Sequence, residues 1–339
     1  METTENKRHF VSLGMFIIDE IVFEDGTPTP ESRTSNPQIG GGGTYASIGA
    51  RIWLPAEKVG MIVDRGPDFP DDIQRQLEDY GSDMWLFRDG KASVTTRALN
   101  IYKGDTRGFQ YLTPRIRITP RDLEGTKLER PTCLHFICSP SRAVEIMSEV
   151  HAVKGWHPIT IFEPIPDRCI PEELPALIGR LIMRNVSPNA DEALSLLSMK
   201  VSVSRASVEE AANRFLDIGV GSEGRGSIII RSGALGAYIM TRGRGGRWVD
   251  PFWTAEDASR VVDVTGAGNA FLGGLSAGLL AEKDVYKAAL YATVSSSFVI
   301  EQEGLPRIKR VDMHGSDVES WNGELPFERL ARLKERIHE

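Results

Sequence analysis

The sequence has few cysteines and no paired metal-ligand pattern. Among its 339 residues only Cys133, Cys138 and Cys169 are cysteines, and no two of them form a Cys-x-x-Cys pair. The six histidines are scattered, with neither a His-x-His nor a His-x-x-x-His spacing. A zinc site is therefore not expected. The three cysteines are expected to be reduced thiols in the core of a cytoplasmic protein.

The sequence also lacks long apolar runs and an excess of positive charge. No run approaches the ~20 apolar residues of a membrane helix, and the polar start METTENKRHF has no signal-peptide core. The net charge of -7 argues against a general nucleic-acid binder, which usually has a basic surface. Apolar and charged shares of 41% and 26% are typical of a globular protein with a sizeable core. We therefore expect a small-molecule substrate, and neither nucleic acid nor membrane as a partner.

Strand and helix patterns alternate along most of the chain. Apolar runs at 10–22, 59–63, 134–138, 159–162 and 227–230 predict strands. Helical patterns occupy 45–53, 70–81, 141–150, 172–182, 207–219, 269–281, 284–301 and 326–337. Ser207 and Glu210 have the spacing of a capping box at the start of one helix. The alternation predicts an α/β fold, with a mostly parallel central sheet flanked by helices on both faces, in one domain over 1–339.

The region 84–118 differs, because short β-like runs are separated there by turn sequences at 88–90 and 103–105. It is expected to form a small sheet that protrudes from the main body. The segment carries three aromatic residues, Tyr102, Phe109 and Tyr111. This pattern is compatible with three roles: lining a substrate pocket, forming a dimer contact, or simple packing. Packing is slightly favoured.

The clearest functional signal is the string VVDVTGAGN at 261–269, followed at once by an apolar helical pattern. Gly266, Ala267 and Gly268 are small enough for successive backbone N–H groups to point at one spot. The start of the helix adds partial positive charge at that spot. Such a site suits an anion, above all a γ-phosphate during transfer. A tight turn capped by Asn269 is the structural alternative.

This string resembles the second signature of the ribokinase (PfkB-type) carbohydrate kinase family, Asp-Thr-x-Gly-Ala-Gly-Asp. Other segments follow the family's motif order, so the resemblance spans nearly the whole chain. It implies a ribokinase-like fold with a small β lid near 15–35 and 84–118. The implied activity is transfer of a phosphoryl group from ATP, with Mg²⁺, to a sugar, nucleoside or related metabolite. A homodimer through the lid is a further expectation from the resemblance.

The resemblance also assigns roles to individual residues. Asp263 belongs with Gly266, Ala267, Gly268 and Asn269 to the catalytic string. The residues that it assigns to substrate are Asp19, Gly42 and Gly43. Those that it assigns to the nucleotide are Asn189, Glu192, Arg231, Gly233 and Gly236. In the Asn-x-x-Glu motif, Glu192 is associated with Mg²⁺ indirectly, at the phosphate end of the nucleotide.

Three positions depart from the family pattern. Asn269 replaces the aspartate that takes the proton from the attacking hydroxyl, and an amide cannot take up a proton near neutral pH. General-base catalysis typically contributes about 10²–10⁴ in rate. Ala46 or Ser47 stands where the family has a sugar-binding asparagine. Arg231 replaces a threonine, and its guanidinium either pairs with phosphate or lies on the surface.

Two functions therefore stay open. One is an ATP-dependent phosphotransferase that tolerates Asn269, with Asp263, a metal-bound water or the substrate itself managing the proton. The other is a catalytically inactive binding or regulatory protein on the kinase fold. Turnover with ATP distinguishes them.

Overall fold

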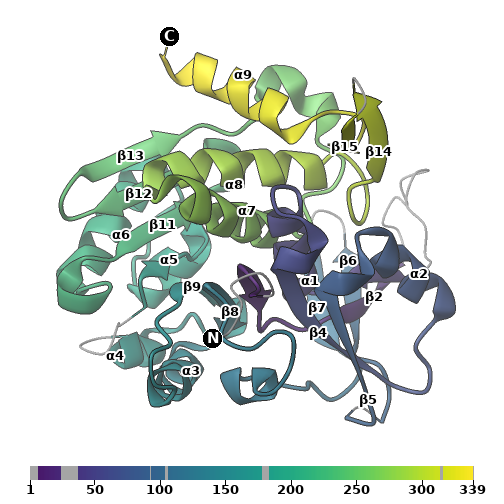
Figure 1. The fold of residues 1–339 in the computed structure, drawn as a ribbon. Helices are drawn as coiled ribbons and strands as arrows, with labels where there is room; N and C mark the ends of the chain where they lie inside the picture. Colours follow the sequence, from purple (N-terminus) through teal and green to yellow (C-terminus); the bar gives the residue numbers. More distant parts are fainter. Residues whose placement is uncertain are drawn as a thin grey trace.

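The structure is a computed structural model that describes residues 7–23, 37–91, 93–103, 106–177, 183–313 and 316–338. Its largest element is a nine-stranded sheet of order β13-β12-β11-β10-β9-β8-β1-β4-β5 (Figure 1). The strands are β1 (Phe10–Ser12), β4 (Val59–Arg65), β5 (Trp85–Asp89), β8 (Cys133–Cys138), β9 (Ile159–Pro164), β10 (Asn185–Val186), β11 (Ser227–Arg231), β12 (Ala237–Thr241) and β13 (Gly245–Val249). Neighbours from β11 to β5 pair in parallel, and β12–β13 is an antiparallel edge hairpin. The expected mostly parallel sheet is confirmed.

Helices cover both faces of this sheet. They are α1 (Gly42–Arg51), α2 (Asp71–Asp79), α3 (Pro140–Ala152), α4 (Leu174–Leu177), α5 (Ala190–Leu196), α6 (Arg205–Ile218), α7 (Ala267–Glu282), α8 (Val285–Val299) and α9 (Pro326–His338). Successive strand residues point to opposite faces, so Met61 packs with α1, α2, α7, α8 and α9. Its neighbour Ile62 packs in the core that contains α3, α4, α5 and α6. This two-sided burial explains why the strands appear in the sequence as continuous apolar runs.

Helices α1 and α7 pack closely because glycines face each other's backbone. A Cβ at Gly49 would overlap the carbonyl of Ala270, and a Cβ at Gly273 would overlap the carbonyl of Ala46. The starts of the two helices also lie close together, since a Cβ at Gly42 would be 2.9 Å from Asn269 Nδ2. This packing places the string 266–269 beside the glycines at 41–43.

A separate four-stranded sheet has the order β3-β2-β6-β7. Its strands are β2 (Ile17–Phe23), β3 (Gln38–Gly40), β6 (Arg97–Lys103) and β7 (Thr106–Tyr111). The expected small sheet is therefore present, but Trp85–Asp89 does not belong to it, because these residues pair with β4 in the main sheet. Residues 24–36 of the predicted lid, with 92, 104 and 105, lie outside the described residues.

The structure corrects several predicted element boundaries. The apolar run 10–22 is divided between β1 and β2, so Asp19 lies within the small sheet and not at the end of the first strand. Helix α6 is capped by Ser204, whose side chain accepts from Ser207 N–H, so Ser207 is not the cap. Helix α4 is described over Leu174–Leu177, and the rest of the helix predicted to 182 lies outside the described residues. The hairpin β14 (Ile308–Met313) and β15 (Ser316–Trp321) was not predicted.

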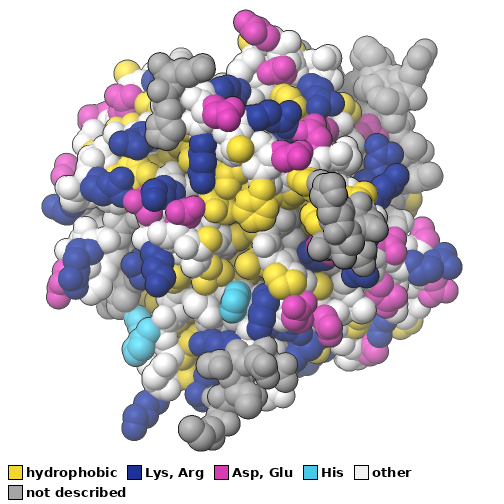
Figure 2. Space-filling view, turned by 45° about the horizontal axis from the view of Figure 1, so that its top comes forward, with side chains coloured by type: hydrophobic (Ala, Val, Ile, Leu, Met, Phe, Trp, Pro, Cys, Tyr) yellow, Lys and Arg dark blue, Asp and Glu magenta, His cyan; other side chains and the backbone are white. Residues whose placement is uncertain are grey.

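The three cysteines are buried and unbonded, as the sequence predicts. On the face drawn in Figure 2, charged side chains of both signs surround a central area of apolar side chains. Among the described residues, no helix has both the length and the hydropathy that crossing a bilayer requires.

Candidate active site

The carboxyl ends of the parallel strands meet at one edge of the sheet, where ligands of α/β proteins usually bind. A cavity of about 1340 Å³ lies there, between the ends of β9 and β11 and the N-termini of α1, α5 and α7. Most of the predicted site residues line it: Asp19, Gly42, Asn189, Glu192, Arg231, Gly233, Gly236, Gly266, Ala267, Gly268 and Asn269. The fold therefore brings these distant positions of the sequence to one cavity.

Two predicted residues do not line this cavity. Gly43 is buried, and a Cβ there would overlap the carbonyl of Gly14, so it permits close contact between α1 and the chain after β1. Asp263 Oδ1 accepts a hydrogen bond from Thr265 N–H at 3.0 Å, within the turn that precedes α7. The structure gives Asp263 a role in shaping this turn. Its catalytic role stays a prediction.

Helix α7 begins with an uncapped N-terminus. Gly266 is the N-cap with φ 76° and ψ -7°, a left-handed conformation that favours glycine, and no side chain caps the helix. A Cβ at this position would also overlap the ring of Tyr45. Asn269 lies inside the first turn, so the alternative in which it caps the helix is wrong. The first N–H groups of a helix have no partner within it, so this end is suited to an anion.

Asn269 is held by a carboxylate that the sequence analysis missed. Its Nδ2 donates to Glu163 Oε2 at 2.8 Å. Glu163 is the penultimate residue of β9, lines the cavity and is only 4% exposed. An ionised carboxylate only accepts hydrogen bonds, so Asn269 must turn its NH₂ group toward it. The available signal was one acid in the otherwise apolar run ITIFEP.

Glu163 is the centre of a buried polar network. Its Oε1 lies 2.9 Å from Arg231 Nη2, and its Oε2 lies 3.4 Å from His135 Nε2. His135 Nδ1 in turn lies 2.9 Å from Ser12 Oγ. Burial alone would raise the pKa of Glu163, but the charge of Arg231 and the contacts with His135 and Asn269 outweigh it and lower this pKa. Glu163 therefore carries its negative charge at neutral pH.

Arg231 lies in the cavity wall, so the alternative of a surface side chain is wrong. Its side chain is 11% exposed, and Nη2 donates to Ser187 O at 3.1 Å. A Cβ on Gly268 would overlap Arg231 Nη1, so the guanidinium lies directly against the first turn of α7. Its Nε is buried without a hydrogen-bond partner among the described residues. A cation thus stands beside the predicted anion site.

Asn189 and Glu192 form a capping box at the start of α5. Asn189 Oδ1 accepts from Glu192 N–H at 2.8 Å, and the Glu192 carboxylate accepts from Asn189 N and Nδ2 at 2.7 and 2.8 Å. Burial raises the pKa of Glu192 to about 7; the charge of Arg231 opposes this rise and that of Glu163 adds to it. Arg231 Nη2 is 3.6 Å from Glu192 but 2.9 Å from Glu163, so its charge favours ionisation of Glu163 more strongly.

The small sheet supplies another wall of the cavity. Asp19 is buried, and its carboxylate lies where a Cβ on Gly40 would be. Phe109 and Tyr111 also line the cavity, which corrects the preference for simple packing. The side chain of Tyr102 lies outside the described residues. Ala46 and Ser47 are buried in α1 away from the cavity, so neither replaces the family's sugar-binding asparagine.

The described residues contain no group of three or more His, Cys, Asp or Glu side chains arranged to hold a metal ion. Both oxygens of Glu192 accept hydrogen bonds from Asn189. Mg²⁺ bound with a nucleotide commonly uses one or two carboxylates and the phosphates. The indirect role of Glu192 toward Mg²⁺ stays a prediction.

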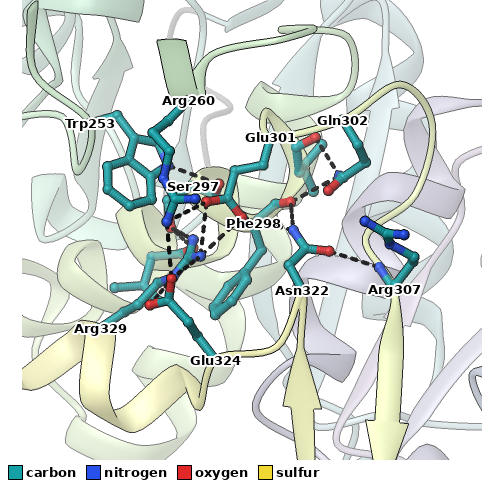
Figure 3. Close-up of polar contacts among 12 residues, drawn as sticks. Trp253, Arg260, Ser297, Phe298, Glu301, Gln302, Arg307, Asn322, Glu324 and Arg329 are labelled. Atoms are coloured by element: carbon teal, nitrogen blue, oxygen red, sulfur yellow. Dashed lines mark hydrogen bonds and ion pairs between the residues drawn. The ribbon is translucent and has the colours of Figure 1, made fainter. Parts of the chain in front are cut away.

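A buried ionic cluster supports the wall formed by Trp253 and Ser297 (Figure 3). Arg329 donates to Ser297 Oγ and to Glu301, each at 2.9 Å, and pairs with Glu324 at 3.2 Å. Trp253 Nε1 donates to Ser297 O at 3.3 Å. The cluster therefore joins α9 to the end of α8 and fixes two residues that face the cavity.

Comparison with known proteins agrees with this arrangement. Residues 166–308 match the model of the pfkB family carbohydrate kinases. Protein MAK32 of Saccharomyces cerevisiae is 33% identical over 97% of this chain and 93% of its own length. An uncharacterised protein of Schizosaccharomyces pombe is 32% identical over 96% of this chain and 92% of its own.

A solved structure of Arabidopsis thaliana ribokinase complexed with ribose and ATP has the same fold. It is 17% identical, has a TM-score of 0.61, and the match covers 88% of this chain and 94% of the ribokinase. Fold, motif order and near full-length similarity agree. The chain therefore belongs to the pfkB family of carbohydrate kinases.

Proposed function

We propose that this protein is an ATP-dependent phosphotransferase for a small molecule, a sugar, a nucleoside or a related metabolite, in which Asn269 weakens proton transfer. The observation that carries the proposal is the uncapped start of α7, with Arg231 against Gly268, at the wall of one large cavity. Its volume of about 1340 Å³ exceeds the roughly 300–1,000 Å³ of a typical small-ligand site. It thus has room for a nucleotide and an acceptor together.

The residues assigned to the nucleotide support ATP as the donor. Asn189, Glu192, Gly233 and Gly236 line the same cavity as the anion site at Gly268. The similar Arabidopsis ribokinase was solved with ATP. When bound with the nucleotide, Mg²⁺ supplies neutralisation of charge that develops on the phosphate oxygens.

Asp19 supports a hydroxyl-bearing acceptor. Its carboxylate accepts hydrogen bonds, and it lines the cavity together with Tyr111. The acceptor hydroxyl must lose its proton during attack on the phosphate, and Asn269 stands at the position that would take this proton in the family motif. Without a base within reach of this hydroxyl, turnover is expected to be about 10²–10⁴ slower than with an efficient one.

A second candidate is a nucleotide- or metabolite-binding protein without turnover. This candidate is favoured because the carboxylate nearest to Asn269, that of Glu163, already contacts Arg231, His135 and Asn269. In this case the same cavity binds ligands and no phosphoryl group is transferred.

The test combines calorimetric ATP binding with ADP release over a broad acceptor panel. Gly268→Asp places a negative charge at the anion site, and Gly243→Asp, at a loop glycine where an added Cβ would meet nothing within 4 Å, is the matched control. The proposal predicts ATP binding and slow ADP release by the wild type and the control, and loss of both in Gly268→Asp. Binding without ADP release would favour the second candidate. Absence of binding would overturn both.

A further inference from the structure

Resting on the proposed phosphotransferase function, we propose that Glu163 is the proton acceptor and that Arg231 controls it. In the free protein Arg231 pairs with Glu163. When the triphosphate occupies the start of α7, Arg231 turns to the transferred phosphate and leaves Glu163 free to take the acceptor's proton. Glu163 is then a catalytic residue, and His135, behind it, is a positioning residue.

The position of Glu163 supports its role as the proton acceptor. Its Oε2 is 2.8 Å from Asn269 Nδ2, so a carboxylate lies within hydrogen-bond distance of the place where the family motif has one. Among the described residues no other carboxylate forms a hydrogen bond with Asn269. Glu163 and Asn269 line the same cavity. A carboxylate offers about four acceptor sites, and three contacts are made here, so one site is left for a substrate hydroxyl.

The position of Arg231 supports its control of Glu163. One guanidinium nitrogen, Nη2, is 2.9 Å from Glu163, and the other, Nη1, lies against Gly268. Its Nε is buried and makes no hydrogen bond in the described part of the chain. A phosphate at the start of α7 would therefore meet unused donors of Arg231 without movement of the backbone. Arginine is suited to this exchange because its planar fork matches carboxylate and phosphate alike.

The charges around Glu163 couple the binding of the triphosphate to the proton transfer. It contacts Arg231 on β11, His135 on β8 and Asn269 on α7, and Glu192 on α5 lies on the other side of the same Arg231, close enough for the two carboxylate charges to influence each other. Burial is the largest influence on the pKa of Glu163 and acts upward, and the charge of Arg231 is the largest influence downward. When a phosphate shares that charge, the balance shifts and Glu163 becomes a stronger base. Nucleotide binding thus activates the proton acceptor.

The reaction step balances. The acceptor hydroxyl gives its proton to Glu163, and its oxygen forms a bond with the γ-phosphorus. The bond between the γ-phosphorus and the oxygen bridging to the β-phosphate breaks, and ADP leaves. When ADP departs, Arg231 returns to Glu163, whose pKa falls again, and the proton passes to solvent. Asn269 holds the carboxylate in position by its amide hydrogen bond throughout.

The central test compares Glu163→Gln with Glu173→Gln. Glu173 is also a buried glutamate paired with an arginine, Arg168, but it does not line the cavity. We expect Glu163→Gln to lose about 10²–10⁴-fold in kcat and Glu173→Gln to keep its kcat. ATP binding by Glu163→Gln is expected to be retained or tighter, because Arg231 loses its counter-ion. A merely structural role for Glu163 would weaken binding and turnover together.

The double variant Glu163→Gln with Asn269→Asp is the rescue test. It keeps one carboxylate and one amide in contact but exchanges their positions, so the charge of the network is unchanged and folding does not depend on an unpaired Arg231. We expect kcat within about tenfold of the wild type, a loss far smaller than that from removing a base. The acidic fall of the wild-type kcat–pH profile is expected to vanish in Glu163→Gln and to return in the double variant.

Each outcome of these two tests either supports or overturns the proposed role of Glu163. Full activity in Glu163→Gln would overturn the inference and leave the phosphotransferase function standing. Loss in Glu163→Gln without rescue in the double variant would assign Glu163 a structural role only and overturn the inference. ATP binding with no ADP release by the wild type and both variants would overturn the inference together with the proposed function.

Discussion

Replacing Asn269 by aspartate places a second carboxylate against Glu163. The amide nitrogen that is replaced lies 2.8 Å from Glu163 Oε2, so two ionised groups would stand almost in contact. Two unit charges at ~2.8 Å repel by about 6 kcal/mol at an effective dielectric constant of ~20. The pair avoids this repulsion by sharing a proton, as carboxylate dyads do.

The free energy needed to keep that proton bound sets the size of the destabilisation. A carboxyl group with an ordinary pKa near ~4 requires about 1.4 kcal/mol per pH unit to stay protonated above that pH. At pH 7 the limit is therefore about 4 kcal/mol, which is smaller than the full repulsion. The folded protein holds this proton where the unfolded chain has released it. The raised folded-state pKa means that stability is lost as pH rises from ~4 to that pKa.

Urea unfolding followed by circular dichroism at pH 5, 6, 7 and 8 measures the effect. We expect the difference in unfolding free energy between the wild type and Asn269→Asp to grow by about 1.4 kcal/mol per pH unit over this range, until the folded pKa is reached. Adding Glu163→Gln removes the second charge and should restore the wild-type pH dependence. A difference that is constant between pH 5 and 8 would refute the contact between the two positions.

Three further predictions concern other parts of the structure. Burial raises the pKa of Glu192 to about 7, so its ionisation lowers the free energy of unfolding as pH rises from its ordinary pKa to about 7. In Glu192→Gln the loss of unfolding free energy over this pH range should be smaller by about 3 kcal/mol than in the wild type. Equal profiles of unfolding free energy against pH would contradict this prediction. Gly273→Ala should destabilise by about 1–3 kcal/mol because its Cβ meets a carbonyl of α1, whereas Gly243→Ala, with open space, should change stability by less than about 0.5 kcal/mol in the same thermal unfolding assay. Arg329→Met should cost about 3–5 kcal/mol because Glu301 loses its closest cation, and a melting temperature near that of the wild type would show that the cluster in Figure 3 contributes little.

The sequence was most informative where structure depends on neighbouring residues. Gly266, Ala267 and Gly268 followed by an apolar helix predict the start of α7, because a left-handed glycine and a helix N-terminus are local features. Local patterns were less reliable for boundaries, because Ser204 and Ser207 are both residues that can cap a helix and the structure uses Ser204.

The sequence by itself determined the family, the parallel sheet, and which segments carry the glycine-rich motif at 266–268. Only the tertiary structure decided what surrounds Asn269. Glu163, His135 and Ser12 lie on β9, β8 and β1, which are far apart in the chain but adjacent in the sheet. Their approach depends on strand order, and no local pattern encodes that order. The same holds for Arg231, whose place against Gly268 follows from how β11 and α7 pack across the edge of the sheet.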